Sequence, residues 1–411
     1  MSELDNNIVL TLTSGPMSAA QIARILGVDA TTVSRRLGRL GSQVLKAGEG
    51  RATRWGLRRS LPMLPGHSVL PVYRVDANGK AEKMALLNIV HPDDSYLVEY
   101  FRSNDASGKV LSEWKFYQSL PWWLSDMRPQ GFLGRSFANQ LRSQGELLDA
   151  DPSKWSEDTT LAVLAKFPQD HVGNLLVGDV AYSRWLERPQ DIAVSDEQAA
   201  IKADAIARGE HFDSSAKGEQ PKFVATLDEG ECIVKFSGWV TQTELDSVAN
   251  RWADLLNAEA LAAAALNTVI ADVAAHNRAF NVDGRTLLAS PRFDRTGQGG
   301  RVGVISFASL DLEFVGRANG HWPDVADVLY QQGVITENAV TRCKVAWAFG
   351  QLIANSDMHL GNVSALNSGG RPYELAPIYD MLPMHYSPTS AGDLPSEPFN
   401  IRFHPNVPKI C

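Results

Sequence analysis

Apolar residues near the start of the chain recur at the spacing of two short helices. The first helix is predicted over residues 19–26, with Ser18 as its N-cap and Gly27 at its end. After a turn, a second helix is predicted, capped by Asp29 or Thr31. Its inward positions are all apolar: Val33, Leu37 and Leu40. Two helices joined by such a turn are typical of a helix-turn-helix unit.

Polar residues form the outward face of the second helix, and two short strands follow it. The outward residues are Thr31, Thr32, Ser34, Arg35 and Arg36. The strands are predicted over residues 43–46 and 52–57, around a glycine-containing turn at residues 48–51. This order of elements predicts a winged helix-turn-helix domain over residues 1–60.

Charge is unevenly distributed along the 411 residues, whose formal net charge is -8. Residues 1–60 contain nine Lys or Arg and four Asp or Glu, which gives +5 and leaves -13 for the remainder. A basic head favours DNA as a partner, with Arg35 and Arg36 on bases or phosphates and Arg51 and Arg54 on the DNA backbone. A protein-interaction module is the alternative interpretation of the same unit.

Composition excludes several classes of protein. With 44% hydrophobic residues the chain can bury a large core, yet no apolar run approaches the roughly 20 residues of a membrane span. The first residues lack the basic and apolar stretches of a signal peptide, so we expect a cytoplasmic protein. The three cysteines argue against a disulfide framework, because they are odd in number and widely spaced: Cys232, Cys343 and Cys411.

The region after the head predicts a linker and then a mixture of strands and helices. The linker spans residues 61–72, where prolines and a glycine gather: Pro62, Pro65, Gly66 and Pro71. Hairpins are predicted at Asn78–Gly79 and at Gly178–Asp179, with a helical, aromatic middle between them. Its aromatic residues are expected in the core: Trp114, Tyr117, Trp122 and Trp123. Residues 191–216 are typical of a helix and an exposed loop.

A small polar loop then runs into a pair of strands. Backbone N–H groups of such a loop, at residues 214–222, can face phosphate oxygens. Strands are predicted over residues 223–227 and 232–236, and Lys235 is a lone cation in the second of them. Burying an unpaired ammonium is costly, so a partner is expected, such as an ATP phosphate together with Glu259. An edge-strand lysine that reaches to solvent is the alternative.

Another hairpin precedes an irregular segment. Asp283–Gly284 separates strands over residues 279–282 and 286–289, and residues 290–295 follow them. A kinase hinge would lie at such a place, with backbone groups facing adenine and Asp294 facing a ribose. The glycines from 297 to 303 lack the spacing of a dinucleotide-binding motif and predict a flexible loop.

A helix predicted over residues 336–354 leads into the most informative segment. Its core-facing positions are expected to be Val345, Phe349, Leu352 and Ile353. Asp357 stands five residues before Asn362, which is the spacing of the kinase catalytic loop. A short hairpin over residues 363–375 then leads to Asp380, where kinases place a metal-binding aspartate. Oxygen ligands from Asn362 and Asp380 suit Mg²⁺.

Five motifs in this order resemble those of HipA-type toxin kinases. They are Ser215-x-x-Gly218-x-Gln220-x-Lys222, Ile233-Val234-Lys235, Arg292-Phe293-Asp294-Arg295, Leu352 to Asn362 and Leu375 to Asp380. The resemblance spans about residues 70 to 400, and the added winged helix is most similar to the YjjJ-like branch. It implies an α+β, protein-kinase-like bilobal fold, with an N-terminal lobe over residues 73–300 and a helical C-terminal lobe over residues 301–411.

The resemblance also implies a Mg-ATP-dependent serine/threonine kinase. Asp357 would be the catalytic base, Lys235 would bind ATP phosphates, and Asn362 and Asp380 would hold Mg²⁺. Further ATP contacts would come from Lys217, Gly218, Glu219, Gln220, Lys222, Pro291, Arg292, Phe293, Asp294, His359 and Tyr379. Phosphorylation of its own Ser215, or of Ser214, would add negative charge to the loop and switch the kinase off.

The chain departs from the family pattern at two points, and two alternative functions stay open. Pro291 has no N–H to offer adenine, and relatives continue with further C-terminal helices, so a shortened helical lobe is expected. The substrate would be a cellular protein such as a translation component, and a homodimer on DNA is expected. One alternative is a DNA-binding regulator whose body senses nucleotide without transferring phosphate. The other is a nuclease that uses Asp357, Asp380 and a metal.

Overall fold

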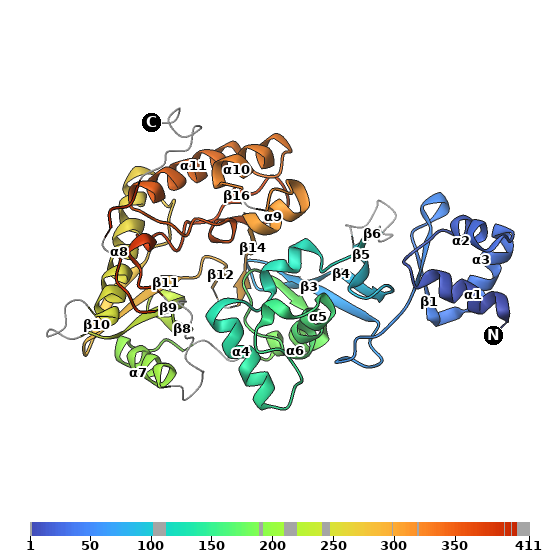
Figure 1. Cartoon of the computed structure of the whole chain (residues 1–411), viewed down its shortest axis with the longest axis horizontal. Coiled ribbons are helices and arrows are strands. Elements are labelled where there is room, and N and C mark those ends of the chain that lie inside the picture. The colour runs from blue at the N-terminus through green and yellow to red at the C-terminus, as the bar shows by residue number, and fades with distance from the viewer. Residues whose placement is uncertain are drawn as a thin grey trace.

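The protein is an α+β protein, as predicted, made of a helical head, two sheet-containing bodies and a helical body (Figure 1). The computed structural model describes residues 2–101, 112–188, 192–208, 220–240, 247–297, 299–318, 320–389, 391–395 and 397–400. Within these ranges, no helix has both the length and the apolar character that a membrane crossing requires.

The head contains both predicted helices and the predicted hairpin. Its elements are α1 (Glu3–Leu12), α2 (Ala19–Leu26), α3 (Ala30–Arg39), β1 (Val44–Ala47) and β2 (Arg54–Leu57). Ser18 caps α2, Gly27 ends it in the left-handed conformation with φ of 64°, and Asp29 caps α3. Helix α1 was not predicted, and its buried Ile8 and Leu12 complete the core of the head.

The head is fixed to the sheet that follows it. An apolar cluster joins the two: Leu45, Ala47, Val90 and Leu97. The main chain continues the contact, because His91 N–H donates to the Leu57 carbonyl at 2.9 Å. The Arg59 guanidinium also binds both carboxylate oxygens of Asp158, at 2.6 and 2.8 Å. The head therefore has a set position on the body.

The first body is built on a five-stranded antiparallel sheet in the order β6-β5-β4-β3-β7. Its strands are β3 (Val69–Val75), β4 (Ala81–Val90), β5 (Ser95–Phe101), β6 (Ser112–Tyr117) and β7 (Leu175–Val177). Its helices are α4 (Gly131–Ser143), α5 (Glu157–Lys166) and α6 (Gly178–Leu186). The hairpin predicted at Asn78–Gly79 is confirmed and joins β3 to β4.

Three predictions for this body are wrong. The linker ends earlier than residue 72, because Pro71 already lies in β3. A proline is tolerated there, since β7 pairs only with residues 72–74 of this strand and Pro71 needs no N–H on that side. Gly178 begins α6 instead of a hairpin, since Ala181 and Trp185 lie four residues apart and are buried on one face. The aromatic residues expected in a helix lie in β6 or in a 3-10 turn: Trp114, Tyr117, Trp122 and Trp123.

The second body has a four-stranded antiparallel sheet in the order β10-β11-β9-β8. Its strands are β8 (Lys222–Leu227), β9 (Gly230–Trp239), β10 (Arg278–Val282) and β11 (Arg285–Pro291), and its helices are α7 (Asp196–Ala207) and α8 (Val248–Val269). Both hairpins predicted here are confirmed. Because the two sheets have separate cores, the N-terminal lobe predicted over residues 73–300 consists of two units.

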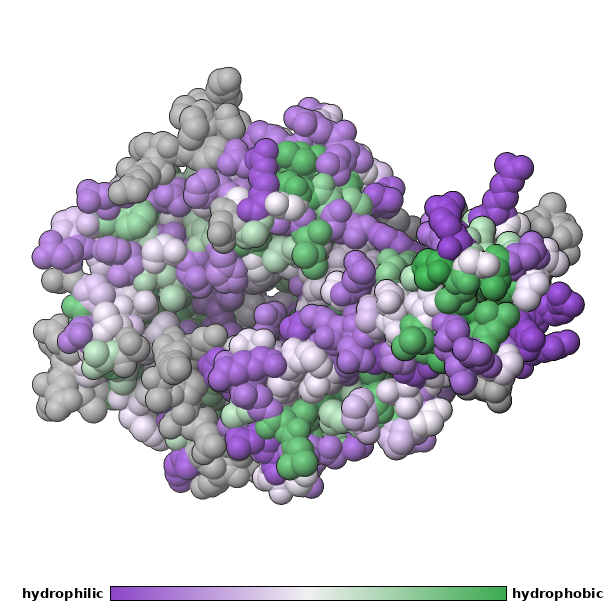
Figure 2. Space-filling view, turned by 45° about the vertical axis from the view of Figure 1, so that its right-hand side comes forward, coloured by the Kyte–Doolittle hydropathy of each residue, from purple (hydrophilic) through white to green (hydrophobic). Residues whose placement is uncertain are grey.

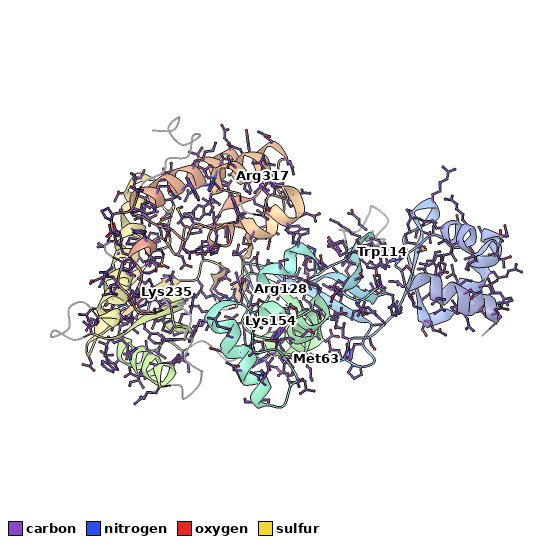
Figure 3. All side chains as sticks on the ribbon, in the orientation of Figure 1. Met63, Trp114, Arg128, Lys154, Lys235 and Arg317 are labelled. Carbon is purple, nitrogen blue, oxygen red and sulfur yellow. The ribbon has the colours of Figure 1, made fainter. Side chains whose placement is uncertain are left out.

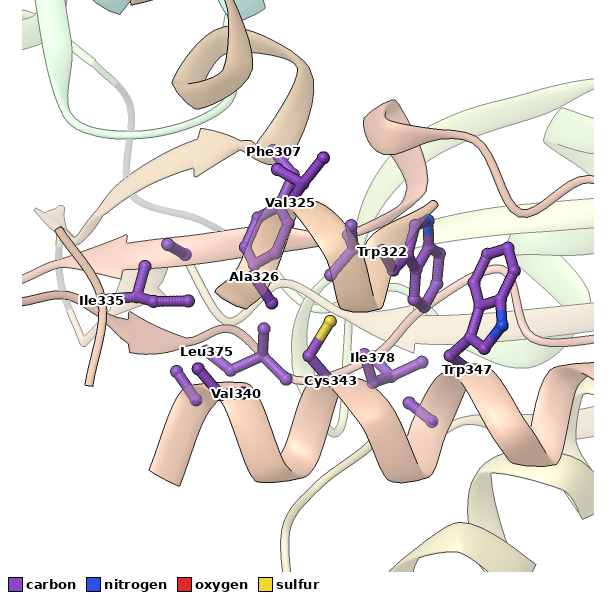
Figure 4. Packing of buried hydrophobic residues seen from close by; sticks show 14 of the residues in the cluster. Phe307, Trp322, Val325, Ala326, Ile335, Val340, Cys343, Trp347, Leu375 and Ile378 are labelled. Carbon is purple, nitrogen blue, oxygen red and sulfur yellow. The ribbon is translucent and has the colours of Figure 1, made fainter. Parts of the chain in front are cut away.

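The helical body contains the largest apolar core of the described residues (Figure 4). Its helices are α9 (Phe307–Phe314), α10 (Trp322–Gln331) and α11 (Glu337–Leu352), and short strands accompany them: β12 (Arg295–Thr296), β13 (Gly300–Arg301), β14 (Gly303–Ser306), β15 (Ser364–Asn367) and β16 (Glu374–Leu375). The glycine segment at 297–303 thus contains β13, which pairs with the preceding strand β12. The predicted inward face of α11 is partly wrong: Phe349 and Ile353 pack against the core as expected, but Leu352 is 58% exposed, and the fully buried positions include Cys343 and Trp347.

Gly56 provides a test of the docked head. A Cβ atom at this position would lie 2.9 Å from Leu97 Cδ1 and 3.1 Å from Val90 Cγ1. We expect Gly56→Val to destabilise the protein by about 1–3 kcal/mol, the usual cost of overpacking, and to expose the chain after β2 to proteases. Thermal unfolding and limited proteolysis measure both effects.

Gly38→Val in α3 is the matched control, since nothing lies within 4 Å of a Cβ atom there. Equal resistance to proteolysis in the two variants would contradict a fixed head.

Candidate active site

Lys235 is buried at the centre of the candidate site. Its strand β9 lies between β8 and β11, so the edge-strand alternative is wrong. The Nζ atom lies 2.7 and 2.8 Å from the two carboxylate oxygens of Glu259, which extends from α8 and is 1% exposed. It also donates to Asp380 Oδ1. Figure 3 shows Lys235 on the sheet, beneath the helical body.

The charges of this cluster stabilise one another. Burial alone would lower the pKa of Lys235, but the carboxylates of Asp380 and Glu259 raise it above its ordinary value. Burial raises the pKa of Asp380, but Lys235 and Lys222 outweigh burial and hold it at about 2. For Glu259, burial dominates and raises the pKa. Lys235 is therefore a protonated amine and Asp380 a carboxylate at neutral pH.

Asn355 joins the loop that carries Asp357 to the loop that carries Asp380. Helix α11 ends before Ala354, which has φ of 62°, and the chain then turns into the loop. The buried Asn355 amide donates to the Asp380 carbonyl at 3.4 Å and accepts from the Asp357 N–H at 3.0 Å. Sequence patterns did not single out Asn355, because an asparagine beside a motif has no distinctive spacing.

Asp357 itself is accessible, with a side chain that is 51% exposed. Asn362 Nδ2 donates to the Asp357 carbonyl at 2.9 Å and to its carboxylate at 3.4 Å. His359 Nε2 lies 3.8 Å from the same carboxylate. Figure 2 shows a hollow bordered by hydrophilic residues below the helical body.

Asn362 and Asp380 fit a magnesium ion that also binds phosphate. Asn362 donates through Nδ2, which leaves its Oδ1 as the atom that could bind a cation. The described residues hold no group of three or more His, Cys, Asp or Glu that could bind a metal by itself. Mg²⁺ commonly takes one or two protein oxygens and completes its shell with water and nucleotide phosphates.

The remaining residues predicted to contact ATP divide into two sets. Phe293 stacks on Tyr379 with ring centroids 6.0 Å apart, and the Tyr379 hydroxyl donates to the Gly361 carbonyl. Lys222 is the cross-strand neighbour of Lys235, and Gln220 donates to the Phe236 carbonyl at 3.4 Å. The predicted residues Ser214, Ser215, Lys217, Gly218 and Glu219 lie outside the described residues.

The hinge prediction needs a correction. Asp294 accepts hydrogen bonds from Arg292 Nε at 3.0 Å, Arg295 Nη1 at 2.8 Å and the Gly173 N–H at 2.8 Å. Its carboxylate is buried in this ion cluster, so the ribose contact predicted for Asp294 is wrong. The Arg292 guanidinium belongs to the same cluster, while Pro291 pairs with Cys232 at the end of β11.

Comparisons with known proteins agree over most of the chain. Residues 66–186 match the family described as "YjjJ-like toxin, middle domain", and residues 214–403 match "HipA-like C-terminal domain". Toxin YjjJ of Escherichia coli (strain K12) is 37% identical over 418 residues, which cover 100% of this chain and 89% of that protein.

Two solved structures are more distant. A chain of the Shewanella oneidensis MR-1 complex of HipA, HipB and operator DNA has a TM-score of 0.46 and 16% identity, over 77% of this chain and 79% of that one. The Helicobacter pylori proinflammatory kinase CtkA has a TM-score of 0.31 and 17% identity, over 41% of this chain and 55% of its own. On the identity to Toxin YjjJ and the two domain matches, the chain belongs to the YjjJ-like family of HipA-type toxins.

Proposed function

We propose that this toxin is a Mg-ATP-dependent serine/threonine protein kinase. The observation that carries the proposal is the buried contact of Lys235 with both Glu259 and Asp380. A strand lysine paired with a helix glutamate, next to a metal-binding aspartate, is how protein kinases hold ATP phosphates. A metal-dependent nuclease would not require a lysine held in this way.

Phosphoryl transfer depends mainly on positioning and on neutralising charge. Lys235 and Lys222 would bind phosphate oxygens of ATP from the sheet. Asn362 and Asp380 would hold Mg²⁺, which supplies positive charge next to the phosphates. Pro291 and Phe293 would contact adenine through the backbone carbonyl and the ring.

Asp357 would act as the catalytic base. The substrate hydroxyl oxygen would bond to the γ-phosphorus while the bond from that phosphorus to ADP breaks, and the Asp357 carboxylate would accept the hydroxyl proton. Its exposed side chain leaves room for a protein substrate, and its backbone is held by Asn355 and Asn362.

We also propose that the kinase phosphorylates itself on Ser215 or Ser214. A phosphate there would add nearly two negative charges to the loop expected to cover ATP. Repulsion between this group and the ATP phosphates would then reduce activity, as a built-in switch.

For the head, we propose a winged helix that binds DNA. Four polar or basic side chains of α3 and the hairpin are exposed: Ser34, Arg35, Arg51 and Arg54. Thr31 is exposed too, and Thr32 is half-buried. Arg36 is less suited to DNA than predicted, because its guanidinium lies 3.5 Å from Asp5 and also binds Ser2.

The first test removes the proposed base. We expect Asp357→Asn to reduce phosphate transfer by about 10²- to 10⁴-fold, the usual contribution of a general base. Incubation with labelled ATP measures transfer to the protein itself and to lysate proteins, and mass spectrometry locates phosphate on Ser214 or Ser215.

Asp283→Asn is its control, because Asp283 is an exposed hairpin residue with φ of 48°, which asparagine accepts. If neither wild type nor this control transfers label, or if Asp357→Asn matches them, the protein is not a kinase of this type.

The second test separates the fold from the chemistry of Lys235. Lys235→Met leaves Glu259 buried without a cation, which costs about 3–5 kcal/mol and should lower the midpoint of thermal unfolding. Lys235→Met/Glu259→Leu removes the buried carboxylate as well, so the midpoint should return toward that of wild type. Phosphate transfer should be absent from both variants. Transfer retained by either would refute the role of Lys235.

The third test concerns the head. Affinity for double-stranded DNA should fall as salt rises, and Arg35→Ala should reduce the slope of log affinity against log salt by about 1. Arg36→Ala should change the slope less, because Asp5 already pairs with Arg36. Fluorescence anisotropy over a salt series measures both slopes. Salt-independent binding, or an unchanged Arg35→Ala slope, would argue for a protein-interaction module.

A further inference from the structure

A second pocket lies outside the candidate active site. Its cavity of about 730 Å³ is lined by residues of α6, α7, the edge strand β8 and the β12–β13 region. Small-molecule sites commonly have volumes of about 300–1,000 Å³. None of the charged residues of the candidate site lines it, neither Lys235 and its two carboxylate partners nor Asp357.

Cations outnumber carboxylates in this pocket. The lining includes five basic residues, Arg184, Arg188, Lys202, Arg295 and Arg301, and two acidic ones, Asp170 and Glu231. Residues 61–411 as a whole carry a net charge of -13, so the excess of positive charge in the pocket is opposite in sign to the charge of this part of the chain.

Among the described residues, each of the two cations of the rim donates to a backbone carbonyl, and Lys202 Nζ also lies over the Phe223 ring, 5.0 Å from its centroid. Arg184 Nη1 donates to the Pro168 carbonyl at 2.7 Å, and Lys202 Nζ donates to the Val224 carbonyl at 2.9 Å. Neither side chain forms an ion pair with any carboxylate that the structure describes. Because Arg184 lies on α6 and Lys202 on α7, two positive charges reach the cavity from different bodies.

At the base of the pocket, Asp170 binds three guanidinium groups, two of which also pair with Asp294. Asp170 binds Arg295 at 2.6 Å and Arg301 at 3.2 Å, and it also contacts Arg292. The Arg301 side chain is 11% exposed. Burial first, and then repulsion from Arg295, lower the pKa of Arg301 to about 10, although Asp170 and Asp294 act in the opposite direction.

Apolar side chains complete the wall of the pocket. Leu176, Trp185, Val194 and Val224 all line it. The Trp185 indole N–H has no hydrogen-bond partner among the described residues. A bare inorganic anion would fill only part of this volume, and a ligand with an organic group would cover the apolar wall as well.

We propose that this pocket binds a small organic phosphate of nucleotide size, in addition to any ATP in the active site. Its phosphate groups contact Arg301, Lys202 and Arg184, whose guanidinium and ammonium groups match phosphate oxygens. Its organic part contacts the wall that includes Trp185. Since Asp170 also holds Arg292 and Arg295 on either side of Phe293, an occupant is placed to influence the hinge.

Calorimetric titration tests the proposal on the full chain. ADP and tripolyphosphate are added, without Mg²⁺, to the Lys235→Met/Glu259→Leu protein, in which the lysine of the active site is absent. We expect one binding site per chain for each probe. Arg184→Met/Lys202→Met should weaken both by about tenfold or more, as expected when charged hydrogen bonds are lost. These two side chains are exposed, so their replacement should leave folding intact. Arg301→Met should have a similar effect.

Arg317→Met is the matched control, because Arg317 is exposed and lies outside the pocket (Figure 3). No binding of either probe, or binding that the pocket substitutions leave unchanged, would overturn the proposal. Binding of tripolyphosphate but not ADP would also overturn the proposal, because the site would then need no organic group. Binding of poly-glutamate but of neither probe would overturn it too, because the site would then need no phosphate.

Discussion

A protonated lysine held by two carboxylates is the contact on which the arrangement of the active site depends. Lys235 comes from β9, Glu259 from α8 and Asp380 from the chain after β16, so one cation fixes three parts of the fold. Charges removed from water are costly, and such a cluster persists only with good geometry. With two carboxylates and one lysine it retains negative charge. Lys222, the cross-strand neighbour of Lys235, offsets this charge.

Charged groups also connect the bodies of the protein, whereas each core is apolar. Arg59 binds Asp158 between the head and the first body. Asp126 of the first body accepts from Ser306 N–H at 2.7 Å and from the Ser309 hydroxyl at 2.9 Å, at the start of α9. Each of these pairs is satisfied in only one arrangement, and the apolar cluster between the head and the first body is closely packed as well. The interfaces therefore set the relative positions of bodies whose cores fold separately.

Local patterns predicted most of the elements around the site. Ser18, Asp29 and the Asp283–Gly284 turn act as expected, because capping and turn formation depend on a few adjacent residues. The predictions were wrong where the conformation of a segment depends on contacts with residues far away in the sequence. Gly178 looks like a hairpin turn, yet β7 pairs with β3 and the next residues gain burial as a helix. The inward face of α11 depends on α10 and β16, which its own periodicity does not encode.

The contact of Lys235 with Glu259 follows from the cost of burying an unpaired lysine, and the kinase-like order of motifs predicted that Asp380 lies near Lys235. Asn355 was missed because its role is a bridge between two loops, which only the tertiary structure brings together.

The hinge motif shows why a charged motif does not by itself indicate a ligand contact. The Asp294 carboxylate accepts hydrogen bonds from two arginine side chains and one backbone N–H, so neither of its oxygens lacks a donor. Arg301, in contrast, forms an ion pair with Asp170 alone among the described residues, and Asp170 also binds Arg292 and Arg295. Both residues are charged and largely buried, and they differ in whether the surrounding charges compensate them. A buried charge that is compensated supports the fold, while one that is not compensated marks a place where a ligand of opposite charge gains free energy.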